Sequence, residues 1–418
     1  MTKYLVAGGR RLSGTVQVHG AKNSVLPILA ATLLSGGECV IENCPRLSDV
    51  AASIRILEHL GCQVVHRGGT VWVDASHPLR GDVPDELMRE MRSSVIFLGA
   101  ILARLGEGTI SYPGGCELGP RPIDLHLKAL RRLGAEVEER FGTLHCRTPV
   151  LTGCEIDLSI PSVGATENAI LAACGARGTT TIVNAAREPE IVDLQRFLVT
   201  LGARVRGAGS SVITVEGGRP LHGGCFRVMG DRIVAATYLS AVAAAGGEAE
   251  ISGVDYRHLA TVTAALQEAG CRVSSEPDRI AIRAQGRLRG LRPIRTAPYP
   301  GFPTDAQAVL MAAMCTAEGA TVFVENIFEN RYRHVDELAR MGADIRVEGR
   351  VAVVYGVPRL HGAPLHCTDL RGGAALTVAA LGAEWESTIS GLEHIRRGYE
   401  DLKGDLTALG ADIRQTDT

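Results

Sequence analysis

The stretch Leu201-Gly202-Ala203-Arg204-Val205 decides the fold, because its pattern occurs six times along the chain. In each copy a helix is expected to end at the glycine and a β-strand to begin shortly after it. The other copies are Leu60–Val64, Leu133–Val137, Ala269–Val273, Met341–Ile345 and Leu409–Ile413. The marker glycines are 68 to 73 residues apart. This period predicts six copies of one structural unit.

A second marker, Leu-x-Gly, keeps the same period and makes a chance repeat improbable. It occurs at Leu12/Gly14, Leu79/Gly81, Leu151/Gly153, Leu221/Gly223, Leu288/Gly290 and Leu360/Gly362. In each unit it precedes a short strand and then an alanine-rich apolar helix, expected at 24–34, 94–105, 166–176 and 306–317. A second strand follows, as at 38–43 and 321–326. An amphipathic helix then ends at the marker glycine, as at 50–60 and 334–341, and two strands such as the 64–73 hairpin close the unit. The predicted unit is β-α-β-α-β-β.

The ends of the chain predict how the six units divide into domains. The sixth unit stops at Thr418 before its last strand, whereas Tyr4–Ala7 form an apparent strand with no unit of their own. We therefore expect the N-terminal strand to complete the sixth unit. The predicted domains are 20–229 and 1–19 plus 230–418, with three units in each. The apolar helices should be buried within each domain, and the amphipathic helices should cover them.

Composition excludes several classes of protein. A chain of 418 residues exceeds the size of one hydrophobic core, which agrees with two domains. The net charge of −2 argues against a general nucleic-acid or membrane-surface binder. We find neither a signal peptide nor an apolar run long enough to span a membrane, and we expect a cytoplasmic protein with no obligate protein partner.

The eleven cysteines suggest neither a disulfide framework nor a metal site, because no Cys-x-x-Cys pair or Cys/His ligand spacing occurs. Cys62 and Cys271 stand where other repeats have alanine, and we interpret them as small buried residues. Cys116 differs, because it lies in a Gly- and Pro-rich loop five residues before Arg121. A neighbouring cation makes a thiol more nucleophilic, so Cys116 is a candidate reactive residue, with a chance surface turn as the alternative.

Charged residues collect at the strand-to-helix turns of all six units. The first turns carry Lys22–Asn23, Arg92–Ser94, Ser162–Gly164, Asp231–Arg232, Thr304–Asp305 and Asp369–Arg371. The second turns carry Arg46, the Cys116/Arg121 loop, Arg187–Glu188, Arg257, Arg331 and Arg397. We interpret Asp369 and Asn326 as helix caps. Capping does not explain cations such as Lys22, Arg92, Arg371 and Arg397, which oppose the helix dipole. Binding of a phosphate- or carboxylate-bearing ligand across a cleft between the domains does explain them.

These residues resemble one enzyme family. The matching segments are Gly20–Asn23, Pro113–His126, Ser162–Thr166, Ala186–Glu190, Pro303–Asp305, Phe328–Arg331, Asp369–Arg371 and Arg397–Glu400. Together they resemble the UDP-N-acetylglucosamine 1-carboxyvinyltransferases of the EPSP synthase superfamily, over the whole chain. The resemblance implies a two-domain inside-out α/β barrel, also called an α/β prism, with the active site in the cleft between the domains. It also implies transfer of the enolpyruvyl group of phosphoenolpyruvate to the 3′-hydroxyl of UDP-N-acetylglucosamine with release of phosphate, and no cofactor or metal.

The resemblance also implies a role for each residue of the site. Cys116 would protonate the methylene carbon of the enolpyruvyl group, and Asp305 would deprotonate the sugar hydroxyl. Lys22, Arg121 and Arg397 would hold the phosphate, and Arg371 the carboxylate. The UDP-sugar site would comprise Asn23, Arg92, Pro122, Ile123, Asp124, Leu125, Ser162, Val163, Gly164 and Ile327.

Two other interpretations stay open at the level of sequence. One is the sister enzyme 3-phosphoshikimate 1-carboxyvinyltransferase, against which Cys116 and the continuation Arg121–His126 argue. The other is a non-catalytic relative that binds the UDP-sugar. Measured turnover with each acceptor would separate the three.

Overall fold

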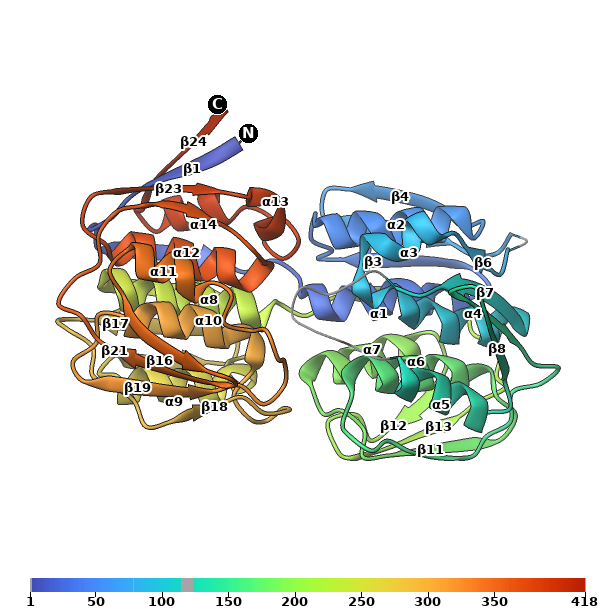
Figure 1. Cartoon of the computed structure of the whole chain (residues 1–418). Helices are drawn as coiled ribbons and strands as arrows, with labels where there is room; N and C mark the ends of the chain where they lie inside the picture. The colour runs from blue at the N-terminus through green and yellow to red at the C-terminus, as the bar shows by residue number, and fades with distance from the viewer. Residues whose placement is uncertain (1, 78, 114–122, 418) are drawn as a thin grey trace. The chain divides into compact units, whose positions relative to one another are not determined.

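The computed structural model describes residues 2–77, 79–113 and 123–417, and these fall into two compact units (Figure 1). We call residues 20–77, 79–113 and 123–229 the N-terminal unit, and residues 2–19 with 230–417 the C-terminal unit. Among the described residues, each unit contains three four-stranded sheets and the helices that pack on them. The predicted six-repeat α/β fold is therefore confirmed.

The elements of the N-terminal unit follow the predicted order closely. Its helices are α1 (Lys22–Ala31), η1 (Thr32–Leu34), α2 (Ser48–His59), α3 (Asp85–Glu90), η2 (Arg92–Ile96), α4 (Phe97–Leu105), α5 (Asp124–Arg132), α6 (Val163–Gly175) and α7 (Pro189–Thr200). Its strands are β3 (Glu38–Glu42), β4 (Gln63–Arg67), β5 (Thr70–Asp74), β6 (Asp82–Val83), β7 (Glu107–Ser111), β8 (Glu136–Arg140), β9 (Thr143–Arg147), β10 (Glu155–Asp157), β11 (Thr179–Val183), β12 (Arg204–Arg206), β13 (Val212–Glu216) and β14 (Gly224–Arg227).

The C-terminal unit repeats this order. Its helices are α8 (Arg232–Ala245), η3 (Tyr256–Leu259), α9 (Ala260–Glu268), α10 (Thr304–Met314), α11 (Val335–Arg340), α12 (Leu370–Gly382), α13 (Leu392–Ile395) and α14 (Leu402–Ala408). Its strands are β1 (Thr2–Ala7), β2 (Leu12–Gln17), β15 (Gly247–Ser252), β16 (Arg272–Glu276), β17 (Arg279–Ala284), β18 (Ile294–Arg295), β19 (Ala320–Val324), β20 (Asp344–Glu348), β21 (Val351–Tyr355), β22 (Pro364–His366), β23 (Glu386–Ser390) and β24 (Asp412–Asp417).

All six sheets share one topology, a parallel pair followed by two antiparallel strands. The order β6-β7-β9-β8 is typical, with β6 parallel to β7 and the others antiparallel. In the sixth sheet, β22-β23-β1-β24, the N-terminal strand β1 occupies the place of β9. Both chain ends therefore lie on neighbouring strands of that sheet (Figure 1).

The first strands of the first and fourth repeats are exchanged between the units. β2 pairs with β15 of the fourth repeat, and β14 pairs with β3 of the first. The chain passes from one unit to the other at Gly20 and again at Gly230. A Cβ at Gly20 would lie 1.8 Å from the carbonyl oxygen of Asn43, and one at Gly230 would lie 1.7 Å from that of Gly253. Both crossing points thus require glycine, because no side chain fits.

The apolar helices form the interior of each unit. In the C-terminal unit α8, α10 and α12 pack on one another, and every residue of α10 from Ala306 to Met314 is buried (Figure 1). α1, α4 and α6 provide the corresponding core of the N-terminal unit. The helices begin within two or three residues of their expected starts. None of the helices among the described residues has the length and apolar character needed to cross a membrane.

Candidate active site

Three buried helices of the C-terminal unit bring their N-termini to one place. α8, α10 and α12 start at Arg232, Thr304 and Leu370, and the side chains at these starts carry charge of both signs. Asp231 caps α8 by accepting hydrogen bonds from the amides of Ile233 and Val234. Free backbone N–H groups and the helix dipoles make such a place favourable for anions.

Asp305, in the first turn of α10, lies between two buried arginines. Its Oδ1 is 2.7 Å from Nη2 of Arg331, and its Oδ2 is 3.0 Å from Nη2 of Arg371. The side chains of Arg331 and Arg371 are only 2% and 4% exposed, whereas that of Asp305 is 26% exposed. The carboxylate is therefore held by both oxygens and still reaches solvent.

Arg371 is held on its other side by Tyr399. Its Nη1 donates to the Tyr399 hydroxyl at 3.4 Å, and the guanidinium lies 5.8 Å from the centre of the ring. Burial opposes the charge on Arg371, but Asp305, Tyr399 and Asp231 outweigh burial and raise its pKa. Burial also raises the pKa of Tyr399. Arg371 is thus a fixed cation with a hydrogen-bonding phenol beside it.

Glu325 connects Ile327, which is expected to contact the UDP-sugar, to the start of α10. Its Oε1 accepts hydrogen bonds from the amides of Ile327 and Phe328, and its Oε2 accepts one from the Thr304 hydroxyl. The interpretation of Asn326 as a helix cap is therefore wrong. The backbone amide of Asn326 donates to the Thr296 hydroxyl, and its side-chain amide donates to the Thr296 carbonyl. The Glu325 carboxylate accepts the backbone hydrogen bonds of this turn instead. Asp369 does cap α12, as expected, through the amides of Arg371 and Gly372.

Arg397 does not lie at a helix N-terminus, contrary to the sequence-based interpretation. It follows α13, and its amide donates to the carbonyl of His394 at 3.4 Å before the chain turns toward α14. The four-residue helix α13 comes between β23 and Arg397. Arg397 therefore follows a helix instead of preceding one. Arg397 is half-buried.

In the N-terminal unit, Lys22 is the first residue of α1 and pairs with Asp49 of α2. The Lys22 Nζ lies 2.7 Å from Oδ2 of Asp49, and the two side chains are 11% and 5% exposed. Asn23 follows on the same helix and is half-buried. The sequence-based interpretation explained Lys22 by ligand binding alone. The contact with Asp49 is a second reason for a lysine at this helix start.

The predicted UDP-sugar segments at the starts of α5 and α6 are joined by His126. Its Nδ1 lies 3.0 Å from the side-chain nitrogen of Asn168, which also donates to the Val95 carbonyl. A Cβ on Gly164 would lie 3.0 Å from the His126 ring. Burial first, and the charge of Arg92 second, lower the pKa of His126 to about 4. The imidazole is therefore neutral and can accept at Nδ1.

The remaining predicted residues of this unit take ordinary positions at helix starts. Arg92 begins η2, and its Nη1 donates to the Pro113 carbonyl at 3.4 Å. Ser162 caps α6 through the amide of Ala165, with Val163 next to it. Asp124 is exposed at the start of α5, between the buried Ile123 and Leu125. Cys116, Arg121 and Pro122 lie outside the described residues.

The structure brings together some of the predicted residues and adds others. Within the C-terminal unit, Asp305 and Arg371 are in contact. Within the N-terminal unit, Gly164 lies next to His126, the residue that follows Leu125. Sequence reasoning gave no role to Asp49, His126 or Arg331. Arg331 and His126 are part of the matching segments, and that was the available signal. Asp49 resembled an ordinary acidic residue in a first helical turn, so no local signal distinguished it.

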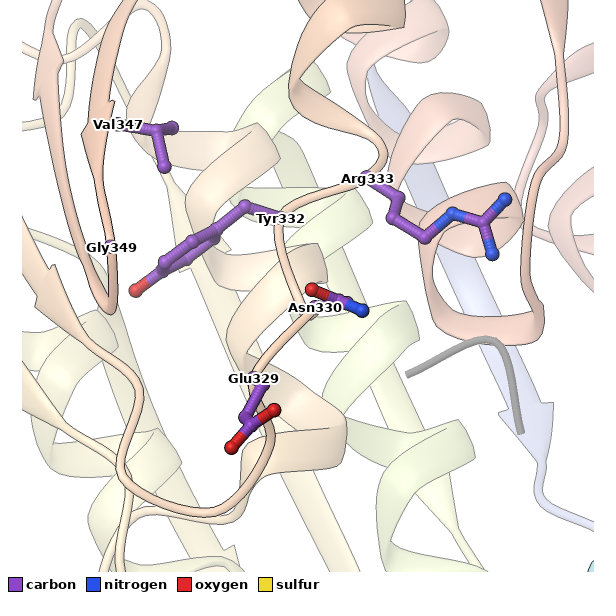
Figure 2. Close-up of a pocket in the computed structure, with 6 residues that line it drawn as sticks. All are labelled: Glu329, Asn330, Tyr332, Arg333, Val347 and Gly349. Carbon is purple, nitrogen blue, oxygen red and sulfur yellow. The ribbon is translucent and has the colours of Figure 1, made fainter. Parts of the chain in front are cut away.

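A cavity of about 470 Å³ lies between the 329–333 turn and the β20–β21 hairpin. Its lining residues are Glu329, Asn330, Tyr332, Arg333, Val347 and Gly349. Figure 2 shows the Tyr332 ring directed toward the hairpin and Arg333 directed away from it. The Tyr332 hydroxyl lies 3.1 Å from the backbone carbonyl oxygen of Phe323 and 3.2 Å from that of Arg350, so either can accept its one proton. The cavity contains none of the predicted site residues, so we do not assign the substrates to it.

Comparison with known proteins identifies the family. The UDP-N-acetylglucosamine 1-carboxyvinyltransferase 2 of Caldanaerobacter subterraneus subsp. tengcongensis is 51% identical over 413 residues, which cover 99% of each chain. The chain belongs to the UDP-N-acetylglucosamine 1-carboxyvinyltransferase family. A second member, UDP-N-acetylglucosamine 1-carboxyvinyltransferase 1 of Symbiobacterium thermophilum, is also 51% identical, over 98% of this chain and 94% of that one.

Broader comparisons place this family among the enolpyruvyl transferases. The sequence profile of the family described as EPSP synthase (3-phosphoshikimate 1-carboxyvinyltransferase) matches residues 6–406. The crystal structure of the enolpyruvyl transferase NikO from Streptomyces tendae superposes with a TM-score of 0.89 at 29% identity, covering 100% of this chain and 99% of that one. EPSP synthase from Acinetobacter baumannii gives a TM-score of 0.76 at 19% identity over the whole of both chains, which shows a shared fold.

Proposed function

We propose that this protein transfers the enolpyruvyl group of phosphoenolpyruvate to the 3′-hydroxyl of UDP-N-acetylglucosamine and releases phosphate, the first committed step of peptidoglycan synthesis. The observation that carries the proposal is the 51% identity, over nearly the whole chain, to an enzyme named for this reaction. Both substrates are cytoplasmic metabolites, and we place the reaction in the cytoplasm. Neither substrate requires a cofactor for this transfer.

The chemistry divides into an addition and an elimination. The sugar oxygen forms a bond to the central carbon of the enolpyruvyl group while the methylene carbon gains a proton. Loss of phosphate from the central carbon and of a proton from the new methyl group then restores the double bond. We assign protonation of the methylene carbon to Cys116 and removal of the hydroxyl proton to Asp305.

The geometry around Asp305 supports its assigned role. A base must be oriented before it can accept a proton, and both oxygens of Asp305 are held by buried guanidinium groups. The side chain is still 26% exposed, so a hydroxyl can approach it. Arg371 is assigned to the substrate carboxylate, and Lys22, Arg121 and Arg397 to the phosphate, because fixed cations stabilise the anionic groups that flank the reacting carbon.

We assign the UDP-sugar to the helix starts of the N-terminal unit and to Ile327. The proposed contacts are Asn23, Arg92, Pro122, Ile123, Asp124, Leu125, Ser162, Val163, Gly164 and Ile327. The buried His126 between Gly164 and Asn168 supports this assignment, because it fixes two of these segments relative to each other. Backbone amides at helix starts are suitable donors to a diphosphate.

Phosphate release measured with each acceptor tests the proposal. Phosphoenolpyruvate with UDP-N-acetylglucosamine should give one phosphate per acceptor consumed, and shikimate 3-phosphate should give none. Turnover only with shikimate 3-phosphate would overturn the proposal in favour of the sister enzyme. Binding of UDP-N-acetylglucosamine without turnover of either acceptor would indicate a non-catalytic relative.

A further inference from the structure

One of the six sheets has an apolar outer face, by which we mean the side that faces away from the buried helices. In the sheet β18-β19-β21-β20, alternate residues of the two central strands point outward, because Phe323, Ala352 and Val354 between them are buried. All six outward residues of these strands are aliphatic or aromatic: Ala320, Val322, Val324, Val351, Val353 and Tyr355. Val351 and Tyr355 are 37% and 40% exposed.

The repeats show that this surface is not a general property of the fold. The strands equivalent to β19 are β3, β7, β11, β15 and β23, and each has two or three polar side chains on its outer face. In β15 these are Glu248, Glu250 and Ser252. The fold therefore accepts polar residues at the positions where β19 has alanine and valine. An exposed apolar face of this kind is typical of a contact surface.

The charged residues around this face also differ from those of the other sheets. Arg295, Arg346 and Glu348 lie on the outer face, and none of them belongs to an ion pair between described residues. Arg346 instead lies 5.3 Å from the centre of the Tyr355 ring. Each of the other five sheets has an ion pair between two of its strands on the outer face. These pairs are Glu42–Arg227, Glu136–Arg147, Glu216–Arg204, Glu248–Arg283 and Glu386–Arg414.

The order of residues across the sheet fits a second copy of the same face. Arg295 on β18 is paired with Val324, Val324 with Val351, and Val351 with Glu348 on β20. This row has a cation at one edge, valines in the middle and a carboxylate at the other edge. A two-fold rotation about an axis parallel to the strands, between β19 and β21, places a second copy face to face with the first. Arg295 of each copy then lies opposite Glu348 of the other.

We propose that two copies of this chain associate through the outer faces of these sheets, with Arg295 of each copy paired with Glu348 of the other. The face is complementary to itself in charge, which favours a second copy as its occupant. Packing the two faces in this way removes the central valines from water, and two twisted sheets stack with their strands within about 30° of each other. None of the residues assigned to the substrates belongs to this face.

The size of the face predicts a weak, reversible dimer. The outward residues of four short strands are fewer than the roughly 20–30 residues that each partner contributes to a standard interface. Sedimentation velocity of the full chain at about 1–100 µM measures the association. We expect the protein to change from monomer to dimer as its concentration rises within this range.

A charge placed in the middle of the face tests whether this surface forms the dimer. Val353→Asp would bury a carboxylate between the two copies and should raise the dissociation constant by roughly 100-fold or more. Ala281 holds the corresponding outward position in β17 of the fourth repeat. Ala281→Asp is therefore the matched control, and it should leave the dissociation constant unchanged.

Reversal of the two edge charges tests the predicted pairing. Arg295→Glu alone and Glu348→Arg alone each place like charges opposite each other at both edges, so each should weaken the dimer by roughly 10- to 100-fold. In an equimolar mixture of the two variants, both edges of a mixed dimer again carry opposite charges, and association should return. A contact within one copy cannot explain such a recovery, because these residues are three strand spacings, about 14 Å, apart in the sheet.

Three outcomes would overturn the proposal. One is a monomer at every concentration, which would leave this face without a second copy. Another is a dimer that Val353→Asp does not weaken, because such a dimer forms through a different surface. The third is a mixture of Arg295→Glu and Glu348→Arg that stays as weakly associated as either variant alone. Circular dichroism shows whether Val353→Asp folds, and if it does not, the mixing experiment decides, because its substitutions are at exposed edge positions.

Discussion

Lys22 and Asp49 form an ion pair of 2.7 Å between the starts of α1 and α2, and both side chains are largely buried. Asp49→Asn would remove the carboxylate charge that the buried ammonium contacts. We expect a loss of about 3 kcal/mol in the free energy of unfolding, because removing one partner of a buried ion pair is costly. Denaturant unfolding of the two proteins measures this loss.

A surface pair provides the control for Asp49→Asn. Arg89 and Asp85 are also in contact, but their side chains are 70% and 49% exposed. Asp85→Asn should therefore cost less than about 1 kcal/mol. The Asp49 variant should in addition raise the KM for phosphoenolpyruvate, because a buried lysine that loses a neighbouring carboxylate gives up its proton more readily and binds phosphate less well. Equal stability losses in the two variants would contradict the proposed importance of burial.

His126 makes the stability of the N-terminal unit depend on pH. Its pKa is lowered from the ordinary 6.5 to about 4, mainly by burial. Between these two pH values the imidazole is protonated in the unfolded chain but neutral in the folded unit. The stability contribution is fully present above pH 6.5 and is lost as the pH falls toward 4. At pH 5 we expect the loss from this one residue to be about 2 kcal/mol relative to pH 7.

Replacement of His126 tests that origin. His126→Gln removes the titrating group while keeping a side chain that can accept from Asn168. The difference in unfolding free energy between pH 7 and pH 5 should shrink by about 2 kcal/mol. His222 is exposed, and His222→Gln should leave the difference unchanged. A pH dependence that is the same in the His126 variant would show that other groups cause it.

Local sequence signals were sufficient to predict most of the fold. One signal is the glycine that ends each amphipathic helix, and the other is the Leu-x-Gly before each first strand. Both mark positions where the backbone conformation accepts few other residues. The truncated sixth repeat likewise predicted the pairing of β1 with β23 and β24. The helix ends and strand starts depend on residues close together in the sequence, and propensity and periodicity describe such features well. The pairing of β1 instead followed from comparing the strands of the sixth repeat with those of the other five.

The site was harder to predict because its key contacts join distant segments. Asp305 of α10 meets Arg371 of α12 and Arg331 of the 329–333 turn only in the folded unit, and no residue near Asp305 in the sequence predicts either contact. Asn326 was misread because an asparagine in a strand-to-helix turn is usually a cap, whereas here the Glu325 carboxylate accepts from the amides of the turn. Arg397 was misplaced because the sixth repeat contains a short extra helix, α13, which the period does not reveal.

Gly373 in the first turns of α12 tests how tightly the C-terminal core is packed. A Cβ there would lie 2.9 Å from Sγ of Cys367 and 2.9 Å from Cγ1 of Ile395, both buried. Alanine in a helix gains about 1 kcal/mol over glycine, but overpacking a core costs roughly 1–3 kcal/mol. We expect Gly373→Ala to lower the melting temperature.

A second substitution that removes the neighbouring Cys367 sulfur tests whether steric overlap causes the lower stability of Gly373→Ala. Cys367→Ala removes the sulfur that the new methyl group would strike, and the double variant should recover part of the lost stability. Cys367→Ala alone should be destabilising, because it leaves a small cavity. Strict additivity of the two effects in calorimetry would show that the clash is relieved elsewhere.

Cys116 should be the thiol labelled by the epoxide phosphonate fosfomycin. Attack by the sulfur forms a C–S bond as an epoxide C–O bond breaks, and the released oxygen takes up a proton. The other ten cysteines are described by the structure, and eight of them are buried. Burial raises the pKa values of Cys174 and Cys315 to about 12, so few of these thiols are ionised near pH 7.

Cys225 provides the strictest control because it is the exposed cysteine among those ten. Its pKa is raised by partial burial and by the nearby Glu42, which disfavours the thiolate. Peptide mass spectrometry should find the adduct on Cys116 in both the unsubstituted protein and Cys225→Ser. Cys116→Asp keeps a proton donor without a nucleophilic sulfur, so it should retain some phosphate release and resist inactivation. An unchanged inactivation rate in Cys116→Asp, or an adduct on Cys225, would remove Cys116 from the proposed mechanism.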